Sequence, residues 1–233
     1  MFRDLIRVLR DHDSLFREML FDDKFKQGVL SLMITTCTTY IFLEFIRLRI
    51  TWIASESVRV QTVLAWSLWM SSMFLTTAPL ICCGITSFIS VKVTRGNKKK
   101  IFSGISISMF PVALGEILAS PLILLSGGKL TEVKGNLSLE ETLRIARNLT
   151  ESFFRQPAFL MGIIILVFSI ISAVYLICSF LRIVYEMPRM KGLLLVLCSL
   201  ALSAAVVGGI YMTILKGFIY PGIQSFWSRL HPT

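Results

Sequence analysis

Five long apolar segments limit what this chain can fold into more than any other feature of its sequence. They cover about residues 28–46, 60–90, 101–126, 158–181 and 192–215. A helix needs about 20 predominantly apolar residues to cross a bilayer, and the segments are of that size or longer. Because lipid offers backbone groups no hydrogen-bond partner, such segments become helices. The sequence therefore predicts an all-α polytopic membrane protein, a bundle of five transmembrane helices.

The composition agrees with a membrane protein and excludes other classes. Of the 233 residues, 55% are hydrophobic and 16% are charged, and the mean hydropathy is +0.73, too apolar for a soluble domain of this length. The net charge of +10 does not indicate nucleic-acid binding, because the basic residues lie between the apolar segments. All five cysteines lie in apolar runs, where we expect them to be packing residues.

Two short basic connections predict the orientation of the chain. "VKVTRGNKKK" carries five basic residues and no acid, and "RIVYEMPRMK" carries three basic residues. The positive-inside rule places both in the cytosol, with the amino terminus cytosolic and the carboxyl terminus outside. The expected location is the cell membrane of a prokaryote, or the endoplasmic reticulum or Golgi membrane of a eukaryote. The residues expected to make cytosolic contacts are Lys92, Arg95, Lys98, Lys99, Lys100, Arg182, Arg189 and Lys191.

Three regions follow from this pattern: a cytosolic amphipathic segment at 1–27, a transmembrane domain at 28–217 and an outer interfacial tail at 218–233. The first region has no uninterrupted apolar run, so we expect no cleaved leader. Its apolar residues recur with helical spacing, which predicts a helix along the cytosolic membrane surface. Asp11, His12 and Asp13 interrupt it and predict a turn with the N-cap of a second piece. A metal cluster of these residues with Asp22 and Asp23 is the less favoured interpretation.

The outer loop, 127–157, contains a second amphipathic pattern. "SLEETLRIARNLTESFF" begins with a capping box, Ser138 followed by Glu141, and continues with apolar residues on one helical face. It predicts a short helix on the outer membrane surface or on the bundle. Two glycosylation sequons lie in the same loop, at Asn136 and Asn148.

Two acids, Glu44 and Glu116, lie inside the apolar segments. Because both fall toward the outer ends of their spans, the sequence predicts that Glu116 pairs with Arg47 or Arg49 rather than lining a pore. Around Glu116, Pro111 predicts a helix bend, Gly115 a close helix approach, and Pro121 the end of the helix. The second apolar segment contains Pro79 but is predicted as one helix.

Small residues recur at every fourth position of the last span, at Ala201, Ala205 and Gly209. This spacing lets helix backbones approach closely. It predicts packing within the chain, with a homo-oligomer seam through the fifth helix as the alternative.

Catalytic patterns are absent from the sequence. The two histidines, His12 and His231, fall on opposite sides of the predicted membrane, and no HExxH, P-loop, GxSxG or DDxxD motif occurs. We therefore expect no enzyme, metal or cofactor.

Two stretches resemble the core of the Yip/YIPF family, five-span membrane proteins named for their interaction with Rab-type GTPases. In "LTTAPLICCGITSFISVKVTRGNKKKIFSGISISMFPVALGEIL", a helix ends in a short basic loop and the next helix leads through small residues to Pro111. In "YLICSFLRIVYEMPRMKGLLLVLC", Arg182, Arg189 and Lys191 match the family's short fourth connection. The short start of the chain is most like a prokaryotic member.

The resemblance implies an N-cytosolic bundle of five helices without catalytic activity. It implies a scaffold or adaptor in membrane organisation or vesicle trafficking, which contacts partner proteins, small GTPases among them, or lipids. Two alternatives come from the residues themselves. One is a transporter or ion-permeation component that uses Glu44 and Glu116, and the other is a membrane enzyme acting on lipid.

Overall fold

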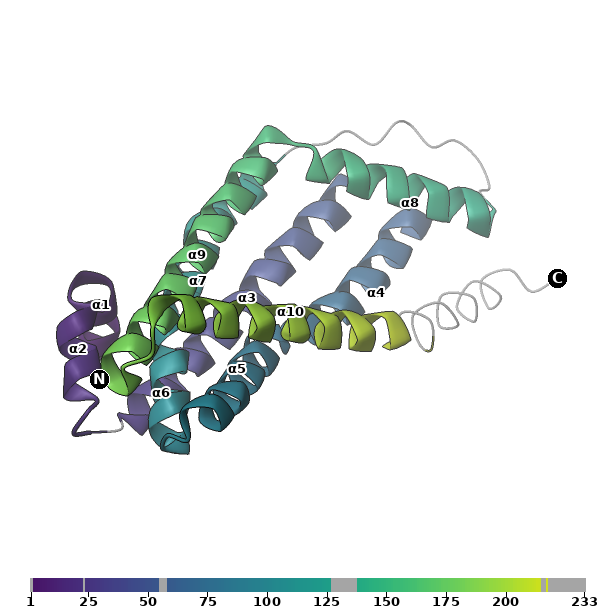
Figure 1. Ribbon diagram of the computed structural model, residues 1–233. Helices are drawn as coiled ribbons and strands as arrows, with labels where there is room; N and C mark the ends of the chain where they lie inside the picture. Colours follow the sequence, from purple (N-terminus) through teal and green to yellow (C-terminus); the bar gives the residue numbers. More distant parts are fainter. Residues whose placement is uncertain (1, 23, 55–57, 127–137, 215–216, 218–233) are drawn as a thin grey trace.

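The computed structural model describes residues 2–22, 24–54, 58–126, 138–214 and 217, and within these ranges it is helical and contains no strand (Figure 1). The helices of the described residues are α1 (Phe2–Arg10), α2 (His12–Glu18), α3 (Phe25–Ile53), α4 (Val58–Leu75), α5 (Ala78–Thr94), α6 (Lys98–Ser108), α7 (Phe110–Leu125), α8 (Leu139–Phe154), α9 (Pro157–Tyr185) and α10 (Arg189–Ile214).

Five helical stretches in the described part of the chain are long and apolar enough to cross a membrane, as the sequence predicts. They are Phe25–Ile53, Val60–Thr94, Lys98–Leu125, Pro157–Tyr185 and Arg189–Thr213. The first extends well past the predicted end at residue 46, because the charged residues near its end are bonded within the fold, as described below. Five such stretches indicate a multi-pass membrane protein.

The second span is two helices, so the prediction of a single helix is wrong. α4 ends at Leu75 and α5 begins at Ala78. Pro79 lies in the first turn of α5, where its missing N–H group is not needed. In a continuous helix, the Pro79 ring would clash with the carbonyl of Leu75, which lies four residues before it. The break therefore falls where the proline requires it.

The third span is also broken. α6 ends at Ser108 and α7 begins at Phe110, which puts Pro111 in the first turn of α7. The prediction that Pro121 ends the helix is wrong, since Pro121 lies inside α7, which continues to Leu125. A proline removes only one helical hydrogen bond, and apolar surroundings offer the neighbouring backbone groups no competing partner.

α7 is the central helix of the bundle. It packs against α9 on one side and α3 on the other, while α10 packs mainly against α5. Figure 1 shows α9 and α10 diverging from their shared turn. Gly115 makes the α7–α9 contact close, because a Cβ atom there would collide with the Ser169 side chain of α9. Gly28 does the same for α3 and α6, where a Cβ atom would lie 2.6 Å from Cα of Ser103.

Two hydrophobic clusters occupy the two ends of the bundle. One contains Ile105 of α6 and Phe180 of α9 together with the buried face of α1 and α2. We call this the basic end, because the α5–α6 and α9–α10 connections with their eight lysines and arginines lie there. The other cluster joins α3 and α4 to α8, with Ile50, Leu64 and Phe153 among its members.

The break and the N-cap predicted at residues 11–13 are present, and the two helices on either side of them pack against the bundle. Leu5, Phe16 and Met19 are completely buried against the bundle, whereas Ile6 and Leu9 are exposed. The reason is the break at Asp11, whose carboxylate accepts a hydrogen bond from the Ser14 N–H group and caps α2. The fold-back lets two short helices bury a common face.

α8 begins with the expected capping box, in which Ser138 and Glu141 bond reciprocally. Ala146, Leu149 and Phe153 are buried against α3, α4 and α9, so this helix packs on the bundle. Asn148 is exposed on α8. Asn136 and the interfacial tail at 218–233 lie outside the described residues.

The predicted in-chain packing of Ala201, Ala205 and Gly209 is wrong. All three are exposed, and a Cβ atom at Gly209 would meet nothing within 4 Å. α10 touches its neighbours along a different face, which carries Val196 and the buried Ser199. The homo-oligomer seam stays a prediction.

Candidate functional site

The α5–α6 connection presents unneutralised positive charge at the basic end. Arg95 ends α5 in the left-handed conformation, with a φ of 54°, and Asn97 caps α6 by accepting hydrogen bonds from the N–H groups of Lys99 and Lys100. This tight turn leaves Arg95, Lys98 and Lys99 exposed. Lys100 is tied back, because its Nζ donates to the carbonyl of Leu20 at 2.8 Å.

The α9–α10 connection adds a second set of cations. Glu186 ends α9 in the left-handed conformation, with a φ of 51°, and α10 begins at Arg189. Arg189 and Lys191 are exposed and Arg182 is partly buried. Among the described residues, none of the eight cations of the two connections forms an ion pair. Both connections therefore present positive charge that no acid of the described residues neutralises.

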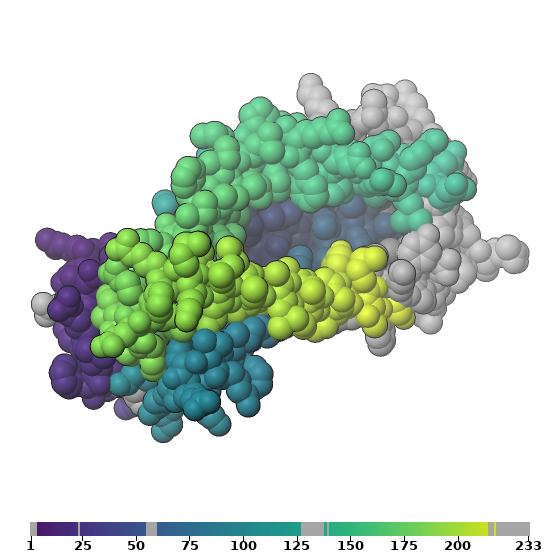
Figure 2. Space-filling model, viewed as in Figure 1, coloured from purple at the N-terminus to yellow at the C-terminus, as the bar shows by residue number. Residues whose placement is uncertain are grey.

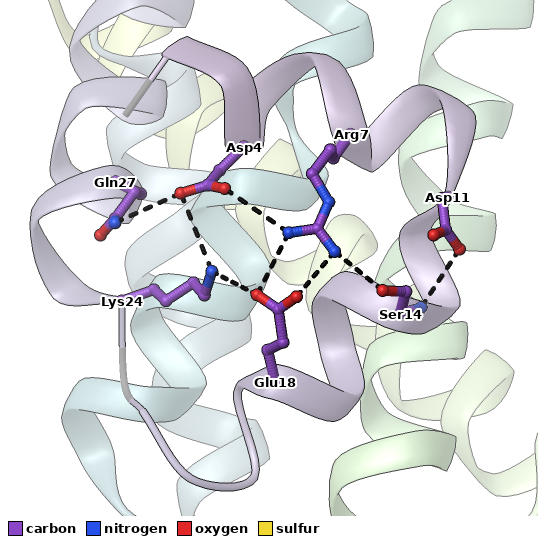
Figure 3. Close-up of polar contacts among 7 residues, drawn as sticks. All are labelled: Asp4, Arg7, Asp11, Ser14, Glu18, Lys24 and Gln27. Atoms are coloured by element: carbon purple, nitrogen blue, oxygen red, sulfur yellow. Dashed lines mark hydrogen bonds and ion pairs between the residues drawn. The ribbon is translucent and has the colours of Figure 1, made fainter.

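The amino-terminal helices are held beside these connections by a network of charged groups (Figure 3). The Arg7 guanidinium donates to both oxygens of Glu18, at 2.7 and 3.2 Å, and to Ser14 Oγ at 2.8 Å. Lys24 Nζ donates to Glu18 at 2.8 Å and lies 3.8 Å from Asp4. The network joins α1, α2 and the start of α3. Sequence analysis missed it, because Arg7 and Glu18 meet only when the chain folds back at Asp11.

The same network shifts the pKa of Glu18. Hydrogen bonds from Arg7 and then Lys24 lower that pKa from 4.5 to about 2. A carboxylate with a lowered pKa in the folded state stabilises that state above its ordinary pKa and loses this effect as the pH falls toward the folded value. The network should therefore hold the helices in place above pH 4.5 and weaken between pH 4.5 and about 2.

We expect Glu18→Gln to loosen the amino-terminal helices at pH 5 but much less near pH 2. Pepsin cleavage within residues 2–22 should be about two to five times faster than in the parent at pH 5, the range for an exposed ion pair. The two rates should approach each other near pH 2, where about half of the parent carboxylate is protonated and most of its stabilising effect is lost. Glu140→Gln on α8 is the control. A difference as large at pH 2 as at pH 5 would contradict the assignment.

Glu116 lies inside the bundle and pairs with no arginine of the described residues, so the predicted pairing with Arg47 or Arg49 is wrong. Its side chain is 5% exposed, and the hydroxyl groups of Thr38 and Thr39 on α3 donate to its two carboxyl oxygens, both at 2.6 Å. Arg47 lies about 12 Å farther along α3 than Thr39, at 1.5 Å of rise per residue. Arg47 is therefore too far along the helix to replace the threonines as the partner of Glu116.

The other charged residues of α3 have partners of their own. Arg47 donates to Glu44 at 2.6 and 2.7 Å, and Ser72 of α4 donates to the same carboxylate at 2.9 Å. Arg49 donates to the carbonyl of Ser126 at the end of α7, at 2.6 Å. The structure therefore does not join the two acids, Glu44 and Glu116, in one site. The "TTCTTY" run was the only sequence signal for the threonine partners.

Metal binding has no candidate among the described residues, where no three His, Cys, Asp or Glu side chains gather closely enough to hold an ion.

No family model matches the chain, and no curated protein or solved structure matches it.

Proposed function

We propose that this chain is a non-enzymatic membrane scaffold or adaptor of the Yip type, whose basic end faces the cytosol and binds a partner protein with an acidic surface. The orientation rests on the positive-inside rule, which also puts the carboxyl terminus outside. A small GTPase is the partner class that the family resemblance implies.

The observation that carries this proposal is the placement of cations at helix starts. α6 begins with Lys98, Lys99 and Lys100, and α10 begins with Arg189 and Lys191, and neither first turn contains an acid. A helix amino terminus is already partly positive, so cations there are unfavourable, where acids would be stabilising by about 0.3–1 kcal/mol each. The positive charge of these helix starts would attract an anionic partner surface, whose binding would offset the repulsion between the cations and the helix termini.

Exposed apolar residues at the same end of the bundle support a protein partner. Ile6, Leu9 and Phe21 of the amino-terminal region are exposed, and the Phe21 side chain is 93% exposed. Protein interfaces typically combine an apolar centre with a charged rim. The amino-terminal helices and the two basic connections supply these two parts at the same end of the bundle.

In-cell photo-crosslinking tests the proposal. A photoreactive phenylalanine analogue replaces Phe21, whose exposed ring allows the change without disturbing the fold. We expect a discrete protein adduct that falls at least about fivefold in the Lys98→Glu, Lys99→Glu variant, because charge reversal repels an acidic surface. Lys100 is left unchanged, since its Nζ bonds to Leu20.

Two controls make the result specific. The same analogue at Phe154 of α8 reports on the opposite end of the bundle, and Arg144→Glu reverses an exposed charge on that helix. Adducts at Phe21 that persist after reversal of Lys98 and Lys99, or an absence of protein adducts, would count against the proposal.

Ion permeation, the alternative that rests on Glu44 and Glu116, receives no support from their contacts. Glu44 bonds to Arg47 on α3 and Ser72 on α4. Glu116 bonds to Thr38 and Thr39 on α3. We therefore propose no second function.

A further inference from the structure

A groove of about 380 Å³ lies between α9 and α10 near the basic end. Its lining is mainly apolar, but two arginines stand at one end of it. The lining residues are Ile171, Val174, Tyr175, Cys178, Ser179, Arg182, Arg189, Met190 and Leu193. In Figure 2, α9 and α10 form two separate ridges on the molecular surface.

The two arginines of the groove have no polar partner in the described part of the chain. Neither Arg182 nor Arg189 forms a hydrogen bond or ion pair there, in contrast to Arg47 and Arg49 at the other end of the bundle. Glu186 lies between them in the sequence but does not line the groove and pairs with neither. Two free guanidinium groups at one site favour a phosphate, which each can bind through two N–H groups.

The dimensions of α9 place these arginines at headgroup level. Its 29 residues span about 43 Å, which matches the roughly 40–45 Å of a bilayer with its headgroup regions. Arg182 lies in the last turn of α9, and Ile171 lies about 16 Å deeper, at 1.5 Å per residue. That distance is about the hydrocarbon depth of one leaflet.

The groove also opens sideways, toward the lipid. Ile171 is 57% exposed, Tyr175 59% and Leu193 37%, although all three lie within the candidate spans. A free phosphate ion would bind the arginines but would leave the apolar lining of the groove exposed. An anionic phospholipid matches both parts of the groove, because its headgroup would lie at the arginines and its acyl chains along the apolar lining.

We propose that the groove between α9 and α10 binds one anionic phospholipid, with its phosphate on Arg182 and Arg189 and an acyl chain along Ile171, Val174 and Leu193. Arg189 belongs both to this site and to the basic end proposed to meet a protein, but lipid binding by the purified chain tests the site without that protein. The inner leaflet, where the positive-inside rule places the basic end, is the anionic one.

Native mass spectrometry of the purified chain in detergent tests the site, with dioleoyl phosphatidylglycerol and dioleoyl phosphatidylcholine as probes. We expect one phosphatidylglycerol to bind at least about tenfold more tightly than phosphatidylcholine. The Arg182→Gln, Arg189→Gln variant should lose that preference, because both positive charges that attract the anionic headgroup are removed. Arg182→Lys with Arg189→Lys keeps both charges but loses the paired N–H donors, so its preference should fall between those of the parent and the glutamine variant.

Lys191→Gln is the matched control, since it removes an exposed charge of the same connection that does not line the groove. Its lipid preference should equal that of the parent. Inorganic phosphate at millimolar concentration should not displace the lipid if the acyl chain contributes. An equal loss in Lys191→Gln, complete displacement by phosphate, or an unchanged preference in the double glutamine variant would overturn the proposal.

Discussion

Replacing Phe16 by alanine is expected to release the amino-terminal helices from the bundle. Phe16 is completely buried, and its ring meets that of Phe180 on α9 edge to face at a centroid distance of 5.5 Å. Removing such a side chain costs about 3–5 kcal/mol. Because α1 and α2 lie at one edge of the bundle, this loss should open them locally while the spans stay folded.

Hydrogen–deuterium exchange of the chain in nanodiscs measures the effect. Amides within residues 12–19 should exchange about 100-fold faster in Phe16→Ala, or as fast as those of a free peptide if that limit is reached first. Phe21→Ala removes the same side chain from an exposed position three residues after α2 and should leave exchange unchanged. Equal effects of the two variants would show that burial of Phe16 is not what anchors the helices.

The Thr38→Val, Thr39→Val variant is expected to destabilise the contact between α3 and α7. Valine keeps the shape of threonine but leaves the Glu116 carboxyl group without both of its donors. Two lost hydrogen bonds to a buried carboxyl group should cost about 2–3 kcal/mol. For a chain of this length, that corresponds to a fall in Tm of about 5–10 °C, measured on the purified protein in detergent.

Two further variants separate this effect from a general loss of hydroxyl groups. Thr36 bonds only to the carbonyl of Leu32 in its own helix, so Thr36→Val should leave the Tm nearly unchanged. Adding Glu116→Met to the double valine variant removes the unsatisfied group and should restore most of the stability. A double variant as stable as the parent, or no recovery on adding Glu116→Met, would contradict the assigned role of these threonines.

The helix ends show which structural features the local sequence pattern predicts in this chain. Asp11 before α2 and the Ser138–Glu141 box before α8 are both present as caps, because capping depends on residues within one turn. The end of α3 was misplaced by several residues. Arg47 and Arg49 end the apolar run, but arginine favours a helix, and the bonds of these two residues to Glu44 and Ser126 hold the last turns of α3 against the bundle.

The sequence by itself determined that this chain is helical and has five apolar helices able to span a membrane. That property depends on the length and hydropathy of each segment, which are local. Only the tertiary structure decided which polar groups meet. Thr39 and Glu116 are 77 residues apart, and Arg7 reaches Glu18 only across a fold-back. Contacts of this kind depend on how the helices cross and where they break, which no single segment encodes.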